Sequence, residues 1–113
     1  MKGRLIMALI SLDEAKVYLR LDSADEDAMI SSFIQSAGIL AKDVGRLSDE
    51  EWETVNAEPS ENDSPEIISL RASLRIAILY TVGYLFEHRD EANHHGLVIT
   101  LRNLLFSVRE GIL

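Results

Sequence analysis

The sequence contains no cysteine and only two prolines among its 113 residues. Disulfide bonds and thiolate metal sites are therefore excluded, and the composition gives no sign of an oxidising compartment. Basic residues are also few, since 11 lysines and arginines stand against 19 aspartates and glutamates, for a formal net charge of −8. Because nonspecific nucleic-acid binding depends on cations that neutralise phosphates, this charge disfavours a DNA-binding protein. It suits a surface that DNA passes without adhering.

The short motifs of common enzyme classes are missing as well. The chain has no Gly-x-Ser-x-Gly, no glycine-rich phosphate loop and no serine set beside a histidine. The sequence therefore favours a protein that is not an enzyme and that needs no cofactor. The apolar run at residues 5–10 is too short to span a bilayer and lacks the signal-peptide pattern, so we expect an intracellular protein without a membrane contact.

Length and hydrophobic content predict one domain with its own core. A chain of 113 residues matches the common domain size, and its hydrophobic fraction of 47% is ordinary for a globular protein. Apolar residues recur at steps of three and four, and no strand-like alternation of useful length is present. We expect an N-terminal extension at residues 1–10 and a single all-helical domain at residues 11–113.

The periodicity predicts four main helices and a short extra one. The first is short and opens with a capping box, in which Ser11 and Glu14 each satisfy a backbone amide of the first turn. The second is strongly amphipathic and ends before Gly45, which we expect in the left-handed conformation that stops helices. Residues 46–63 are acidic and lack a long apolar period, which predicts a short helix capped by Ser48 and then a loop.

The third main helix is the most apolar segment. It begins with Ser64 as N-cap and Pro65 at the first helical position, and it can run to about His88. A helix apolar on most sides belongs at the centre of a bundle or in a subunit interface. Gly83 lies within it and indicates close packing, since glycine costs about 1 kcal/mol against alanine in a helix. With a last helix that stops near Gly111, the predicted fold is all-α, a small bundle with an acidic loop.

All three histidines fall in "YLFEHRDEANHH", residues 84–95, among several acids. A zinc site needs three or four rigidly held ligands, and His88, His94 and His95 do not have the spacing that places two histidines on one helix face. The segment is better explained as a helix end and its loop, where His88 and Arg89 complement the helix dipole.

Acidic pairs leave one enzyme alternative open. All-α nucleotide hydrolases bind magnesium through carboxylates three or four residues apart on two facing helices. Glu50 and Glu53 have this spacing, and Glu87 and Asp90 are the other possible ligands. No second acidic motif matches on the long helices, so a metal-dependent nucleotide hydrolase is the alternative rather than the main hypothesis.

Two arginines lie four residues apart on the long apolar helix, at Arg71 and Arg75. They can form a solvated stripe paired with the abundant acids, in which each pair contributes little. They can equally form an ion-pair surface between subunits of an oligomer. The sequence leaves both interpretations open.

Two stretches carry a resemblance to a known family. The opening pattern leads into acidic residues and an apolar helix, and its matching residues are Leu12, Ala15, Lys16, Leu19, Arg20, Leu21 and Asp22. The second stretch is the exit of the long helix, with Tyr84, Glu87, His88 and Arg89. With this helix order, the chain resembles the small all-helical head–tail connector proteins of tailed bacteriophages and prophages, also labelled gp6-like or DNA-packaging proteins. The acidic stretch at residues 49–63 departs from the family pattern.

The resemblance implies a structural role in the virion neck, after assembly in the bacterial cytoplasm. Family members form a closed ring of about a dozen copies under the portal protein, extend the DNA channel and receive the tail or a stopper protein. DNA would pass through without specific binding, and no reaction would be catalysed. The residues expected to fix the fold or the subunit contact are Arg20, Asp22, Arg71, Arg75, Tyr84, Glu87 and Arg89. A small dimeric bacterial adaptor is a further alternative.

Overall fold

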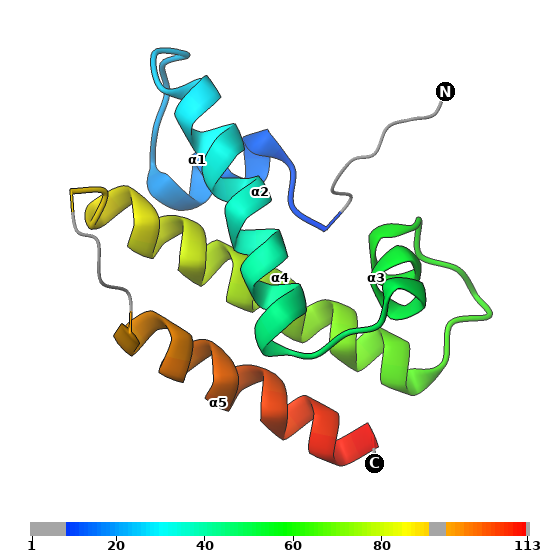
Figure 1. Cartoon of the computed structure of the whole chain (residues 1–113). Coiled ribbons are helices and arrows are strands. Elements are labelled where there is room, and N and C mark those ends of the chain that lie inside the picture. Colours follow the sequence, from blue (N-terminus) through cyan, green and yellow to red (C-terminus); the bar gives the residue numbers. More distant parts are fainter. Residues whose placement is uncertain (1–8, 91–94, 113) are drawn as a thin grey trace.

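The computed structural model describes residues 9–90 and 95–112, with side chains of the last helix described to Phe106. These residues form five helices and no strand: α1 (Leu12–Leu19), α2 (Asp27–Val44), α3 (Asp49–Asn56), α4 (Pro65–Glu87) and α5 (His95–Ile112) (Figure 1). The predicted all-α fold is confirmed, and α3 is the short extra helix.

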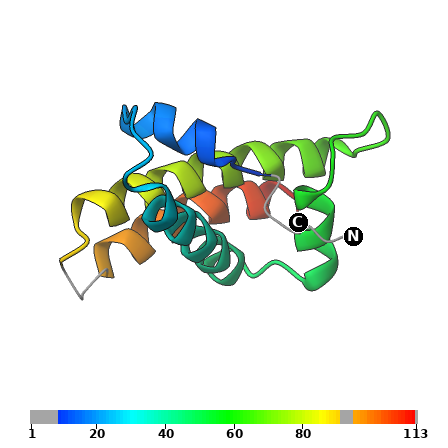
Figure 2. The ribbon, with the colours of Figure 1, turned by 90° about the horizontal axis from the view of Figure 1, so that it is seen from above.

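Helix α4 is the axis of the molecule, and each of the other four helices contacts it. Figures 1 and 2 show α2 crossing α4 and α5 running beside it in the opposite direction. By length and composition α4 could also cross a bilayer, a test that the core helix of a soluble protein passes too. Here its buried face lies in the core, where it presents Leu70, Leu74, Ala77, Ile78, Thr81 and Val82.

Local sequence signals set where three of the helices begin. Ser11 caps α1 and Ser48 caps α3, each in a complete capping box with a glutamate three residues later. The Ser64 hydroxyl accepts a hydrogen bond from the Ile67 amide, and Pro65 occupies the first turn of α4. These caps confirm the predicted starts, because each satisfies amides that the helix itself leaves without a partner.

The core reaches two residues upstream of the domain start expected at residue 11. Leu9 and Ile10 are each only 2% exposed. Arg75 of α4 donates a hydrogen bond to the Leu9 carbonyl and forms an ion pair with Glu14 of α1. One guanidinium thus ties the first described residues and α1 to the axial helix.

This contact also changes the titration of Glu14. The hydrogen bond from Arg75, then that from the Ser11 amide, holds the pKa of Glu14 below its ordinary value of 4.5. A carboxyl whose pKa is lower in the folded state than in the unfolded state stabilises the fold above the unfolded pKa. That stabilisation disappears as the pH falls through the folded pKa.

We expect Glu14→Gln to lower the stability at pH 7, because the neutral side chain loses its ion pair with Arg75. The decline of stability below about pH 4.5 should become flatter, because glutamine does not titrate. Urea unfolding at several pH values from 7 down to 3 measures both effects. Arg75→Gln should flatten the same region, since it removes the cation. Equal pH slopes in the wild type and both variants would show that the pair does not govern acid stability.

The end of α2 differs from the sequence prediction. Gly45 has φ −79°, so it is not left-handed, and the left-handed residue is Arg46, with φ 56°. The small space around residue 45 explains why a glycine stands there. A Cβ at Gly45 would lie 2.8 Å from Leu47 Cδ1, 3.0 Å from the Ala41 carbonyl oxygen and 3.3 Å from Leu105 Cδ1. Glycine is therefore needed here for close packing under α5, not for its conformational freedom.

Candidate docking site

An open pocket of about 540 Å³ lies between the end of α1 and the C-terminal part of α4. We name it the α1–α4 pocket. Its walls are mostly aromatic, with one arginine and one glutamate, and the lining residues are Tyr18, Leu19, Arg20, Tyr80, Gly83, Tyr84, Phe86, Glu87 and His88. The two stretches that carry the family resemblance therefore meet in space: Leu19 and Arg20 come from the first, and Tyr84, Glu87 and His88 come from the second.

Close approach of the two helices forms the pocket. A Cβ at Gly83 would lie 3.0 Å from Tyr18 Cε2, so the glycine makes room for the Tyr18 ring against α4. This confirms the close packing predicted at Gly83. Tyr18 and Tyr80 are nevertheless 48% and 39% exposed, so much of both rings faces solvent in the isolated subunit.

The C-terminal end of α4 is organised by stacking. The rings of Tyr84 and His88 lie parallel within 15°, with their centroids 4.0 Å apart. His88 Nδ1 lies 3.0 Å from the Tyr84 carbonyl oxygen, and His88 is the C-cap of the helix. Helix α4 therefore ends where the sequence predicted a helix end.

Arg20 adopts a backbone conformation that disfavours its own residue type. It is the C-cap of α1, with φ 62° and ψ 45°, and its amide donates to the carbonyls of Lys16 and Val17. A left-handed conformation costs a non-glycine residue about 1–2 kcal/mol. Within the described part of the chain, the exposed Arg20 side chain makes no hydrogen bond or ion pair. The fold of the subunit therefore does not explain the arginine.

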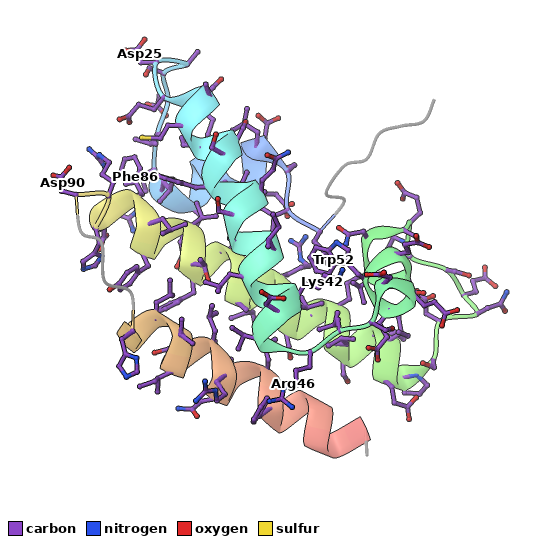
Figure 3. All side chains as sticks on the ribbon, viewed as in Figure 1. Asp25, Lys42, Arg46, Trp52, Phe86 and Asp90 are labelled. Carbon is purple, nitrogen blue, oxygen red and sulfur yellow. The ribbon has the colours of Figure 1, made fainter. Side chains whose placement is uncertain are left out.

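Two more predicted residues lie beside the pocket. Arg89 donates a hydrogen bond to the Phe86 carbonyl, and its guanidinium carbon lies 4.7 Å from the Phe86 ring centroid. Asp22 is exposed in the loop that follows Arg20. Five of the seven predicted site residues, Arg20, Asp22, Tyr84, Glu87 and Arg89, thus lie at one end of the molecule, which Figure 3 marks with Phe86 and Asp90.

The other two predicted site residues lie elsewhere and act within the chain. Arg71 forms an ion pair with Asp63 at 2.9 Å, and both side chains are only 13% exposed. It also donates to the carbonyls of Val55 and Thr54 at 3.2 Å. Both Arg71 and Arg75 are therefore paired with acids of their own chain, as expected from the interpretation that they form a stripe paired with the abundant acids. Arg71 is, however, more buried than a solvated stripe implies.

The structure does not assemble the ligand set of the hydrolase alternative. Helix α3, with Glu50 and Glu53, lies beside the N-terminal half of α4, where Val55 meets Arg71. Glu87 lies 16 residues further along α4, which corresponds to about 24 Å at 1.5 Å per residue. Figure 3 accordingly shows Trp52 of α3 and Asp90 at opposite ends. Among the side chains of residues 9–90 and 95–106, no three of ligating type form a group that could hold a metal ion; His94 lies outside these ranges.

Sequence reasoning missed three aromatic residues of the pocket, Tyr18, Tyr80 and Phe86. Tyr80 lies within the helix that the sequence predicts to be apolar on most sides, and the ring of Tyr18 lies on the exposed side of a short helix. The available signal was Gly83, a helix-interior glycine between Tyr80 and Tyr84, because such a glycine indicates that another side chain approaches closely.

Comparison of the chain with protein-family models gives a match. The family model described as phage gp6-like head-tail connector protein matches residues 9–113. No curated protein and no solved structure matches the chain. The family match starts at Leu9, which is buried in the core. The chain therefore belongs to the phage gp6-like head-tail connector family, and its role is that of a structural connector in the neck of the virion.

Proposed function

We propose that this chain is one subunit of a closed ring that docks under the portal protein, extends the DNA channel and receives the tail or a stopper protein. The ring would contain about a dozen copies, each contacting the next through a heterologous interface that closes by rotation. The subunit would assemble in the bacterial cytoplasm and catalyse no reaction. The net charge of −8 supports a channel through which DNA passes without adhering.

The observation that carries the proposal is the α1–α4 pocket. Tyrosine and arginine are the residue types that most often dominate binding energy at protein interfaces, and here they surround an open pocket in the isolated subunit. Arg20 holds a conformation that disfavours it and has no partner within the described chain. Such backbone strain typically persists where function requires the side chain. The pocket is thus the surface that we propose for docking in the assembled neck.

Arg20→Gly tests the proposal because stability and docking should change in opposite directions. Glycine adopts φ 62° without strain, so we expect the free energy of unfolding to stay equal or to rise by up to about 1 kcal/mol. Binding to the portal ring should weaken, and phage yield should fall. Urea unfolding measures the first effect, and native mass spectrometry of the subunit mixed with the portal ring measures the second.

Two further variants separate the charge of Arg20 from its backbone. Arg20→Asn tolerates the left-handed conformation but has no cation, so it should behave like the glycine variant. Arg20→Lys keeps the cation and should retain most of the docking. Arg89→Ala, at the edge of the pocket, should also weaken assembly. Unchanged assembly and phage yield in the Arg20→Gly and Arg89→Ala variants would overturn the proposed role of the pocket.

A further inference from the structure

The negative charge of the chain is concentrated in one segment. Residues 49–63 hold seven of the 19 acids and no lysine or arginine. The rest of the chain holds 12 acids and 11 bases and is nearly neutral. We call residues 49–63, which comprise α3 and the loop after it, the acidic lobe.

The acidic lobe is held beside the N-terminal half of α4, and only part of its charge is compensated. Asp49 pairs with Lys42 at 2.6 Å and Asp63 pairs with Arg71. The Ser60 amide and then Arg71 hold the pKa of Asp63 below its ordinary value. Four other carboxylates are exposed and make no ion pair with any described residue; these are Glu50, Glu53, Glu58 and Glu61.

Helix α5, unlike the acidic lobe, exposes a face with apolar side chains and a positive charge. Its outer face has no acid from His95 to Phe106 and exposes two large apolar side chains, Ile99 at 41% and Phe106 at 37%. Arg102 lies between them on the same face, is exposed, and has no hydrogen bond or ion pair within the described residues. Arg46 lies beside the same helix (Figure 3). We call Ile99, Arg102 and Phe106 the α5 face.

We propose that the acidic lobe of one subunit docks on the α5 face of the next subunit in the ring. This inference rests on the proposed ring. A ring closed by a heterologous contact needs two different, mutually complementary surfaces on every copy. The chain carries one lobe in which four carboxylates have no ion pair among the described residues. It also carries one exposed helix face, where Arg102, equally without a described partner, lies between apolar side chains. Complementary charges select the partner and its register, and the apolar side chains supply an anchor.

A second copy fits the α5 face better than DNA does. Duplex DNA is bound by many cations, each neutralising a phosphate, whereas this face offers Arg102 with Arg46 beside it. The acidic lobe of the same chain would also repel a polyanion. A neighbouring subunit brings both the opposite charge and a fixed orientation, so the occupant is another copy of this chain.

Charge reversal on full-length protein tests the pairing. Arg102→Glu alone, and Glu50→Lys with Glu53→Lys alone, should each require about tenfold more protein for half-maximal assembly, because an attraction becomes a repulsion. Combining both changes in one chain should restore assembly, as should mixing the two variants. Assembly is followed by native mass spectrometry with and without the portal ring, and circular dichroism checks that each variant is folded. Asp25→Lys, an exposed reversal far from α3, should assemble like the wild type.

The outcomes separate this inference from the proposed function. Wild-type rings together with unchanged assembly of Arg102→Glu would overturn the pairing and leave the ring intact. Loss in both single variants without restoration in the combination would also overturn it. A wild-type chain that stays monomeric alone and on the portal ring would remove the proposed ring, and the pairing with it. Restoration in the combined variant supports both.

Discussion

Replacing Arg71 with alanine should detach the acidic lobe from α4 and lower the free energy of unfolding. The guanidinium bridges α4 to three points of the lobe, the carbonyls of Thr54 and Val55 and the Asp63 carboxylate. Val55 is 1% exposed, so its carbonyl would lose its hydrogen-bond partner in a place that water reaches poorly. An unsatisfied buried acceptor costs about 1–3 kcal/mol, and we expect a loss of that size from this contact alone.

Trp52 reports the change directly. It is the only tryptophan of the chain and lies half-buried on α3. In Arg71→Ala its fluorescence should shift to longer wavelength under native conditions, and the urea midpoint should fall. Arg71→Lys keeps the charge but cannot reach three acceptors with one ammonium group, so it should recover little. Arg102→Ala removes an arginine without a described partner and should stay within about 0.5 kcal/mol of the wild type. An unchanged Trp52 spectrum and midpoint in Arg71→Ala would show that this arginine does not hold the lobe.

The helices were predictable because their signals are local. The capping box of Ser11 and Glu14 spans three residues, and so does the hydrogen bond from the Ile67 amide to Ser64. An N-cap acts on amides of its own first turn, so its effect does not depend on the rest of the fold. The core face of α4 was equally predictable, because its apolar residues recur at steps of three and four in the sequence.

The partners of the arginines could not be predicted, because they are distant in sequence. Arg75 reaches Leu9 and Glu14, more than 60 residues upstream. Arg71 lies 16 residues from the Val55 carbonyl that it binds. Periodicity places both arginines on a helix, but it does not say which elements pack against that helix. Two interpretations therefore stayed open until the packing of α1 and α3 on α4 was known.

The pocket was partly predictable for a different reason. The resemblance singled out residues in two stretches, 12–22 and 84–89, without any physical link between them. Parallel packing of α1 along the C-terminal half of α4 supplies that link, because it brings Arg20 to Tyr84 and Glu87. The exposed rings of Tyr18 and Tyr80 escaped prediction, since an aromatic residue in an amphipathic helix is usually part of the core.

At the end of α2, a single methyl group should be strongly destabilising. In Gly45→Ala the new Cβ meets Leu47 Cδ1 at 2.8 Å and Leu105 Cδ1 at 3.3 Å, and these leucines are 7% and 0% exposed. Neither side chain can move into solvent, so we expect a loss of about 1–3 kcal/mol in the free energy of unfolding, as for other overpacked sites.

The neighbouring Arg46→Gly is the matched control. It places glycine at φ 56°, which relieves strain, and it adds no atom to this packed site, so it should not show the overpacking loss of Gly45→Ala. Chemical denaturation of both variants decides between the two roles for Gly45. If Gly45→Ala were as stable as the wild type, close packing would not be the reason for the glycine, and α5 would have to sit further from the end of α2 than it does here.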